Sequence, residues 1–373
     1  MKVAICGGYP YKKEPIWGGV HAVLFNLNKG LKKYSNLNYN IITHTNKCEK
    51  DIEKIKNIYY LKDPKIYIGT INYSFYPLKV NHFFKKHNYD LINAHTIDFA
   101  YNNLKNVNKL IFTIHGINWE EMKYFTPIQK FLWKNVYIKQ TKKVLKHVKY
   151  IISINNYVNK VIENKTNAMI ININNPVQDK YFKIKDNSKE NQLFYIGVIN
   201  RRKNLYSLIK ALVYVKREIS NFHLNIAGKV TDKKYFDNIQ NFINKNNLKK
   251  NIQYLGIISE EEKIKQFSNM NVLILPSLQE TAPMVISESF ASGKPVITSN
   301  RCGMPSMINH GNNGLLFNPE DPIDIANKII YLLNNKNEYN RMRINTKSFA
   351  IENHSIKKVT KSYHNLFKEI MNN

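Results

Sequence analysis

The chain has 373 residues, of which 43% are hydrophobic and 12% aromatic, and its formal net charge is +29. This length exceeds one ordinary hydrophobic core and predicts two domains of roughly 150 to 200 residues each, while the apolar content excludes a disordered chain. The positive charge is typical of nucleic-acid-binding proteins, but lysine and asparagine are spread over the whole sequence without a compact arginine-rich segment. We therefore expect no nucleic-acid partner.

Three cysteines, Cys6, Cys48 and Cys302, lie far apart and show no spacing typical of a disulfide framework or a zinc site, which indicates a reducing compartment. The apolar run near the N-terminus is too short for a signal peptide, and no stretch approaches the roughly 18 apolar residues of a membrane span. We expect a cytoplasmic protein that can lie on the inner face of the cell membrane without crossing it.

Short apolar runs alternate with helical patterns through the first half of the chain. Helices are expected between the runs, for example over residues 18–34 and 127–149. Buried strands are predicted at residues 2–8, 38–45, 90–96, 109–116, 148–155 and 168–176. This alternation is typical of a doubly wound α/β domain with a parallel sheet, which we place at residues 1–175.

A polar, irregular stretch over residues 174–192 interrupts the pattern, which then restarts. Further strands are predicted at residues 192–199, 222–230, 251–258, 271–277, 294–300 and 314–319. Residues 176–353 therefore form a second doubly wound domain. Because ligands of such sheets bind beyond the carboxyl ends of the strands, each loop that follows a strand is a candidate site.

The segment QETAPMVISESFASGKPVI, residues 279–297, carries the clearest candidate site. A strand ends before it, Pro283 suits the first turn of a helix, and Gly293 stops that helix. The free amides of Thr281, Ala282, Pro283 and Met284 and the positive end of the helix dipole would hold an anion such as phosphate. Glu280 precedes the helix and Glu288 lies inside it, so the two carboxylates must have different roles.

Two other loops carry groups that suit a phosphate. Arg201, Arg202 and Lys203 follow the strand at 192–199, although a solvated basic loop is the ordinary alternative in so basic a chain. Gly18 and Gly19 open the helix at 18–34 and would also present free amides.

His115 ends the strand at 109–116 and precedes Gly116. A lone histidine is more often a structural hydrogen-bonding group than a catalytic one, but its place at the carboxyl end of a strand favours function. His95 ends the neighbouring run in the same way and has less support.

Taken together, these motifs resemble the retaining glycosyltransferases of family 4, with Glu280 and Glu288 as the E-x7-E signature. The ordered motifs GVINRRKN, NIAGKV, PSLQE, SGKPVI and GNNGLLFNPED extend the match over nearly the whole chain. The resemblance implies a GT-B fold, in which two Rossmann-like doubly wound domains face a cleft. It also implies an acceptor site on the first domain, a nucleotide-sugar site on the second, and a C-terminal helix over 354–373 that crosses back to the first.

Carried over residue by residue, the resemblance assigns Glu280 to the donor sugar near its reacting carbon and Glu288 to the ribose hydroxyls. Lys203, with Arg202 or Arg201, would bind the diphosphate and stabilise the charge that develops on it. The amides of Gly18, Gly19 and residues 281–284 would share that task, and His115 would hydrogen-bond the donor sugar.

The sequence contains no Asp-x-Asp motif, so we expect neither a metal nor another cofactor, with the nucleotide-diphosphate sugar as co-substrate. It departs from the family pattern at Val198, where an arginine is common, and at Ser306, where many members carry a glutamate. The pattern does not decide between Arg201 and Arg202 as the substitute.

The resemblance predicts a retaining, metal-independent hexosyltransferase that uses a UDP-sugar in preference to GDP-mannose. Its acceptor would be a glycan or a lipid-linked molecule in surface polysaccharide or glycolipid synthesis. Two alternatives stay open: a GT-B relative with phosphorylase- or epimerase-like activity, and a non-catalytic basic module that binds membrane or nucleic acid. The lysine-rich helix over 127–149 either packs on the first sheet with its lysines in water or docks on anionic lipid.

Overall fold

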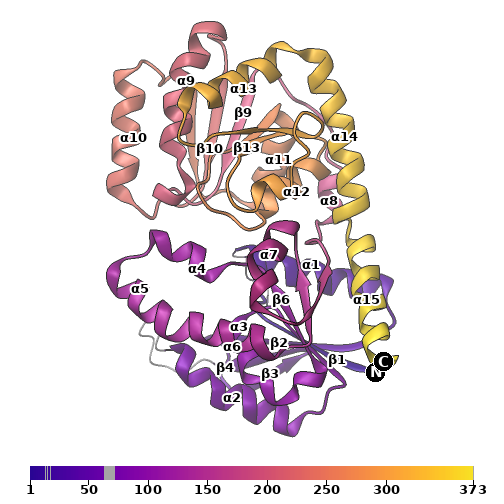
Figure 1. The fold of residues 1–373 in the computed structure, drawn as a ribbon. Coiled ribbons are helices and arrows are strands. Elements are labelled where there is room, and N and C mark those ends of the chain that lie inside the picture. The colour runs from indigo at the N-terminus through magenta and orange to yellow at the C-terminus, as the bar shows by residue number, and fades with distance from the viewer. Residues whose placement is uncertain (13, 15, 17, 63–71, 373) are drawn as a thin grey trace. The chain divides into compact units, whose positions relative to one another are not determined.

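The fold is taken from a computed structural model, which describes residues 1–12, 14, 16, 18–62 and 72–372. These residues form two compact units (Figure 1). The first combines Met1–Pro176 with Ile356–Asn373, and the second is Val177–Ser355. The predicted boundaries at 175/176 and 353/354 lie within two residues of these limits.

Unit 1 is built on an eight-stranded sheet in the order β3-β4-β2-β1-β5-β6-β7-β8. Only β3 and β4 pair antiparallel among its described strands, and they form a hairpin that the sequence pattern did not predict. The strands are β1 (Lys2–Cys6), β2 (Asn38–Thr45), β3 (Ile52–Ile55), β4 (Ile58–Lys62), β5 (Leu91–Ala94), β6 (Leu110–Ile114), β7 (Tyr150–Ser153) and β8 (Met169–Asn172). The helices are α1 (Gly19–Tyr34), α2 (Asn72–Lys86), α3 (Ile97–Asn102), α4 (Asn118–Glu121), α5 (Pro127–Trp133), α6 (Lys139–His147), α7 (Asn156–Ile162) and α15 (Ile356–Asn372).

Unit 2 is built on a six-stranded, fully parallel sheet in the order β11-β10-β9-β12-β13-β14. Its strands are β9 (Gln192–Ile196), β10 (His223–Ala227), β11 (Ile252–Gly256), β12 (Val272–Leu275), β13 (Val296–Ser299) and β14 (Gly314–Phe317). Its helices are α8 (Asp179–Phe182), α9 (Leu205–Glu218), α10 (Lys233–Lys245), α11 (Glu260–Asn269), α12 (Met284–Ala291), α13 (Pro322–Asn334) and α14 (Lys336–His354). The prediction of two doubly wound domains is therefore confirmed.

The apolar runs became strands because a parallel sheet covered on both faces buries every side chain. The runs of β6 and β12 are buried at all positions. In each sheet the first strand of the unit lies inside, between the strands that follow it in the chain: β1 between β2 and β5, and β9 between β10 and β12. The winding direction reverses between β1 and β5 and between β9 and β12, and the loops that leave the two strands of each pair meet at this switch point.

The C-terminal helix α15 belongs to unit 1, as predicted. Its buried side chains Val359, Tyr363 and Phe367 join the core that also contains the α1 stripe of Leu24, Leu27 and Leu31. Gly30 of α1 permits this contact, since a Cβ atom there would lie 1.9 Å from the Thr360 hydroxyl. The helix therefore completes the core of the first unit rather than extending α14.

The predicted helix over 127–149 is continuous but not regular. Between α5 and α6 the chain makes one π-helical turn, Lys134–Ile138. Its inward side chains Tyr137, Val144 and Leu145 are buried, while its lysines are exposed. Its apolar face therefore lies inward and its lysines reach water, where both interpretations of this helix place them.

Candidate functional site

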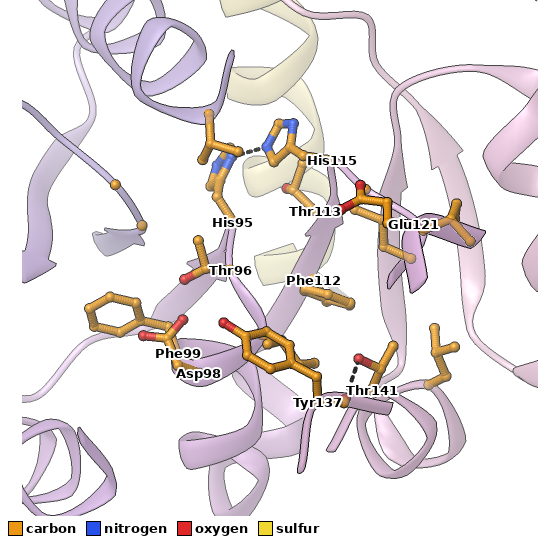
Figure 2. Close-up of a pocket in the computed structure, with 18 of the residues that line it drawn as sticks. His95, Thr96, Asp98, Phe99, Phe112, Thr113, His115, Glu121, Tyr137 and Thr141 are labelled. Carbon is orange, nitrogen blue, oxygen red and sulfur yellow. Dashed lines mark hydrogen bonds between the residues drawn. The ribbon is translucent and has the colours of Figure 1, made fainter. Parts of the chain in front are cut away.

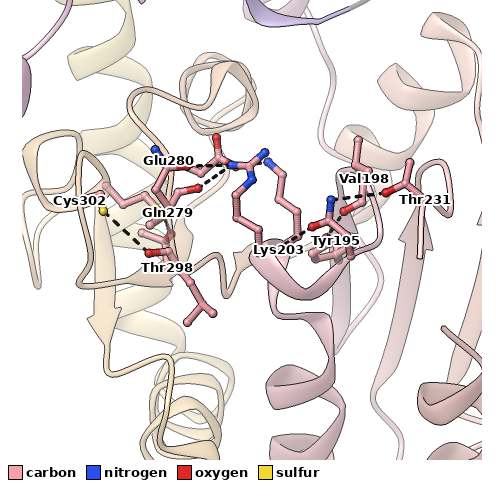
Figure 3. A network of polar contacts seen from close by, with 12 residues as sticks. Tyr195, Val198, Lys203, Thr231, Gln279, Glu280, Thr298 and Cys302 are labelled. Atoms are coloured by element: carbon pink, nitrogen blue, oxygen red, sulfur yellow. Dashed lines mark hydrogen bonds and ion pairs between the residues drawn. The ribbon is translucent and has the colours of Figure 1, made fainter. Parts of the chain in front are cut away.

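The switch point of unit 2 brings Glu280, Arg202 and Lys203 together (Figure 3). Strands β9 and β12 are paired neighbours, so the loops that follow them run side by side, joined by a hydrogen bond from Leu278 N to Arg202 O of 2.9 Å. Arg202 Nη1 donates to Glu280 Oε1 at 3.1 Å and to the Gln279 carbonyl oxygen at 2.7 Å. Lys203 Nζ forms an ion pair with the same Glu280 oxygen.

This cluster, residues 202, 203 and 280, carries one surplus positive charge and is largely withdrawn from water. The side chains of Glu280, Lys203 and Arg202 are 14%, 15% and 28% exposed. Two cations on one carboxylate oxygen leave donor groups available to a further anion. The arrangement can therefore exchange its internal carboxylate for phosphate oxygens.

Arg201 does not join the cluster. Its Nε lies 3.4 Å from Asp232 Oδ2, its guanidinium lies over the Tyr235 ring, and its side chain is 67% exposed. The basic triplet is thus divided, because the short 3-10 turn at Arg201–Lys203 turns successive side chains to different sides. Of the two alternatives that the sequence left open, Arg202 is the one that the structure brings to Glu280.

The loop that carries Glu280 rests directly on the backbone of Gly303. Gly303 N donates to Glu280 O at 2.9 Å, and a Cβ atom on Gly303 would lie 1.7 Å from the Thr281 carbonyl oxygen. Only glycine permits this approach. Sequence reasoning missed Gly303, although its place after β13 at the same edge of the sheet was a usable signal.

Helix α12 ends before Gly293, whose φ is +72°, as predicted, but it begins at Met284 and leaves Pro283, expected in its first turn, outside the helix. Pro283 caps it in an extended conformation and lacks an N–H group. The prediction of amide donors at residues 281–284 therefore applies to Thr281, Ala282 and Met284 but not to Pro283.

Glu288 lies on α12 in surroundings different from those of Glu280. Both of its carboxylate oxygens lie 3.3 Å from Lys263 Nζ on α11, and Lys263 also pairs with Glu260 at 3.0 Å. Burial lowers the pKa of Lys263, but Glu288 and Glu260 outweigh burial and raise that pKa above its usual value. Sequence reasoning missed Lys263. The separate partners of the two glutamates agree with separate roles.

Unit 1 contains a cavity of about 540 Å³ at the carboxyl ends of β1, β2, β5 and β6 (Figure 2). His115 and His95 line it, as do Gly7 and Gly8 after β1. Gly18 and Gly19 are not among the lining residues, although Val20 and His21 of the same helix are. Of the candidates in the first domain, His115 and His95 therefore lie at this cavity, whereas Gly18 and Gly19 do not line it.

His115 ends a directed chain of hydrogen bonds. His95 Nε2 lies 2.8 Å from Asn93 Oδ1, and Asn93 Nδ2 donates to Thr113 Oγ1 at 2.8 Å. Since Asn93 Oδ1 only accepts, His95 must donate from Nε2 and accept at Nδ1, which lies 2.8 Å from His115 Nε2. His115 then carries its proton on Nε2 and keeps Nδ1 as an acceptor, able to receive a hydroxyl hydrogen.

Burial lowers the pKa of His115 to about 4, and burial together with His115 lowers the pKa of His95 well below its usual value. Both rings are therefore neutral at pH 7. Within the described residues, no group of three or more His, Cys, Asp or Glu side chains is placed to hold a metal ion.

Acid is expected to destabilise unit 1 between about pH 6.5 and pH 4. In this range the unfolded His115 binds a proton and the folded one, with a pKa of about 4, does not, so the free energy of unfolding falls as pH falls. The loss for His115 alone is on the order of 3 kcal/mol. Urea unfolding at pH 7 and pH 4.5 measures it: His115→Gln should flatten the pH dependence, and the exposed control His147→Gln should not.

Two family models match adjoining parts of the chain. Residues 17–177 match the model described as Glycosyltransferase Family 4, and residues 177–349 match the model described as Glycosyl transferases group 1. Their junction coincides with the boundary between the two structural units.

Sequence relatives cover most or much of the chain. An uncharacterized glycosyltransferase of Methanocaldococcus jannaschii is 27% identical over 348 residues, which are 90% of this chain and 90% of the relative. The capsular polysaccharide biosynthesis glycosyltransferase CapM of Staphylococcus aureus is 25% identical over 242 residues, 61% of each protein.

Solved structures match the whole chain at low sequence identity. Sucrose-phosphate synthase from Thermosynechococcus elongatus has a TM-score of 0.81 and 17% identity, covering 100% of this chain and 99% of that one. Anabaena HepE in complex with UDP-glucose has a TM-score of 0.74 and 15% identity, covering 99% and 100%. These likenesses show a GT-B fold.

Proposed function

Because the chain is a family 4-like glycosyltransferase built from a Family 4 domain and a group 1 domain, we propose that it is a retaining enzyme that uses a nucleotide-diphosphate sugar without a metal ion. The observation that carries this proposal is the convergence of Arg202 and Lys203 on Glu280 at the switch point of unit 2. A UDP-sugar is the proposed donor, in preference to GDP-mannose, because the structural neighbour HepE is described in complex with UDP-glucose.

In the proposed reaction the bond between the anomeric carbon and the phosphate oxygen breaks, and its electron pair leaves with the nucleoside diphosphate. An acceptor hydroxyl forms the new bond to the same carbon, on the same face of the ring, and its proton passes to the oxygen of the departing diphosphate. Lys203 and Arg202 stabilise the charge on the departing diphosphate, together with the amides and dipole at the start of α12.

Donor binding would redistribute the ion pairs described above. The diphosphate takes over Lys203 and Arg202, and the freed carboxylate of Glu280 accepts hydrogen bonds from sugar hydroxyls. Glu288, held from one side by Lys263, offers its remaining lone pairs to the ribose hydroxyls. His115 accepts a hydroxyl hydrogen of the donor sugar at Nδ1.

A donor panel tests the proposal. UDP-glucose, UDP-galactose, GDP-mannose and ADP-glucose are compared by thermal shift, since a ligand that binds the folded state raises its stability. Proton NMR of the slow hydrolysis of a stabilising α-linked donor should show the α-anomer first. Initial release of the β-anomer would contradict retention, and stabilisation by GDP-mannose alone would contradict the donor preference.

Removal of metal ions is expected to leave turnover unchanged. Lys203, Arg202 and the α12 amides supply positive charge at the diphosphate, which is the part that a metal plays in other sugar transferases. The measurement is transfer or hydrolysis with and without excess EDTA. A loss of activity that Mg²⁺ or Mn²⁺ restores would show the expectation to be wrong.

The acceptor is proposed to be a glycan or a lipid-linked molecule in surface polysaccharide or glycolipid synthesis. The relative CapM, named for capsular polysaccharide biosynthesis, supports this class of acceptor.

A basic face on α5 and α6 supports a further proposal, docking on anionic lipid. No described helix has the length and apolar character needed to cross a bilayer. Lys130, Lys134, Lys142 and Lys146 are exposed, and Phe131 beside them is 68% exposed. Such a face binds a negatively charged surface. Vesicles with phosphatidylglycerol should carry the protein in flotation at low salt and phosphatidylcholine vesicles should not; failure to float with either would contradict docking.

A further inference from the structure

The unit 1 cavity has a charge opposite to that of the chain as a whole. The sequence contains 56 Lys and Arg residues against 27 Asp and Glu. Nevertheless, none of the described residues that line the cavity is Lys or Arg, whereas Asp98 and Glu121 both do so. Exclusion of lysine from one cavity in so basic a protein indicates a ligand that does not need a cation.

Three of the four histidines that line the cavity are neutral at pH 7. Burial lowers the pKa of His21, His95 and His115. The fourth, His44, lies with Nε2 3.2 Å from Asp98 Oδ2. Burial raises the pKa of Asp98, but hydrogen bonds from His44 and Thr96 outweigh it, so Asp98 is ionised at pH 7. An anionic ligand would meet these carboxylates with no Lys or Arg among the described lining residues to offset them.

The cavity also has an aromatic wall. The rings of Trp133 and Tyr137 are stacked, with centroids 4.1 Å apart and planes 8° apart, and Phe112 and Trp119 also line the cavity. Figure 2 shows Tyr137 and Phe112 on one side, with Thr113, His115 and Glu121 beyond them. Aromatic faces suit the apolar C–H faces of a sugar ring, and carboxylates accept its hydroxyl hydrogens.

Two buried polar atoms of the lining residues lack a hydrogen-bond partner in the described part of the protein. They are the indole N–H of Trp133 and Nδ1 of His21. Buried polar groups are ordinarily satisfied, so an unpaired donor and an unpaired ring nitrogen in the lining indicate that a polar ligand or water completes them. The volume, about 540 Å³, is within the range of small-molecule sites.

Resting on the proposed transfer reaction, we propose that this cavity takes an uncharged sugar ring as the acceptor unit and discriminates against acidic sugars and sugar phosphates. The aromatic wall covers one face of the ring, and Asp98 and Glu121 bind its hydroxyls. Discrimination follows from the carboxylates, which repel a uronate or phosphate group.

Tryptophan fluorescence gives a direct test that needs no donor. The chain has three tryptophans, and Trp119 and Trp133 line the cavity. The full-length protein is titrated with methyl β-D-glucopyranoside and methyl β-D-galactopyranoside, and with glucuronate and glucose 6-phosphate at matched ionic strength. We expect a saturable change in the millimolar range with a neutral glycoside and binding at least tenfold weaker for both anions.

Charge reversal at Glu121, with a control at Glu120, supplies the matched variants. Glu121→Lys should weaken the neutral glycoside and strengthen glucuronate, reducing or inverting the preference. Glu120→Lys makes the same charge change on the same helix, at a residue that pairs with Lys123 and is not among those lining the cavity, and should leave the preference unchanged.

Several outcomes would overturn the inference: equal or tighter binding of either anion to the wild type, no saturable response to either neutral glycoside, or equal effects of the two variants. Hydrolysis of the donor, measured on the same preparation, separates the two proposals. Hydrolysis without glycoside binding would refute the acceptor inference alone, whereas glycoside binding without hydrolysis of any donor would refute the proposed transfer reaction.

Discussion

Replacing Lys203 by alanine is expected to lower kcat/KM for sugar transfer by roughly two to three orders of magnitude, the usual effect of removing one donor that stabilises developing charge. Lys203 is 15% exposed, so its ammonium acts on a diphosphate through a partly dry environment in which water screens it weakly. The variant should also bind the nucleoside diphosphate less tightly. Initial rates and nucleotide affinity, measured together, check this result.

Arg201→Ala is the matched control, because it removes a cation of the same turn whose partners are Asp232 and Tyr235 rather than Glu280. Its kcat/KM should stay within a fewfold of wild type. If Arg201→Ala proved as damaging as Lys203→Ala, or if Lys203→Ala kept full activity, the cluster at Glu280 would not be the diphosphate site.

Gly303→Ala is expected to damage both stability and turnover. The added methyl group would lie 1.7 Å from the Thr281 carbonyl oxygen, a backbone atom that no rotamer change can move aside. Such overpacking destabilises by about 1–3 kcal/mol. The displaced loop also carries Glu280, and a shift of about 1 Å at a reacting group can lower turnover roughly 100-fold. Denaturant unfolding and donor hydrolysis measure the two effects.

Ser306→Ala lies on the same turn and is exposed, so it serves as the control. Its free energy of unfolding should change by less than about 0.5 kcal/mol, with turnover close to wild type. Wild-type stability and activity in Gly303→Ala would mean that the loop at Glu280 can move away from residue 303 at no cost.

The sequence predicted the two parallel sheets because buried strands read as unbroken apolar runs. It also placed Glu280 and Lys203 in loops after strands, and the strand order of unit 2 explains why those loops meet. Lys263 escaped prediction because the charge-rich face of α11 makes one lysine indistinguishable from its neighbours. Gly303 escaped because its role depends on a backbone contact with Thr281, 22 positions earlier in the chain. Neither Lys263 nor Gly303 can be recognised from its neighbours in the sequence.

In unit 1, too, some features could be predicted from the sequence and others could not. The runs that became β5 and β6 were predictable, and so was the position of His115 at a strand end. The tautomer of His115 was not, since Asn93, His95 and Thr113 set it from two different strands. The β3–β4 hairpin was missed because its first strand, IEKI, is only four residues long and has two adjacent charged residues at its centre. The acidic character of the cavity was hidden by the basic composition of the chain.

A change in the length of the π turn at Lys134–Ile138 would alter the aromatic wall without altering the rest of the fold. It accommodates one residue more than a regular helix would, and a regular helix rotates by about 100° per residue. Deletion of a single residue from this turn would therefore rotate Trp133 by about a quarter turn relative to Tyr137 and separate the stacked pair, while the sheet and its histidines stayed in place. Insertions and deletions here would allow descendants of this chain to exchange one acceptor for another without altering the donor machinery.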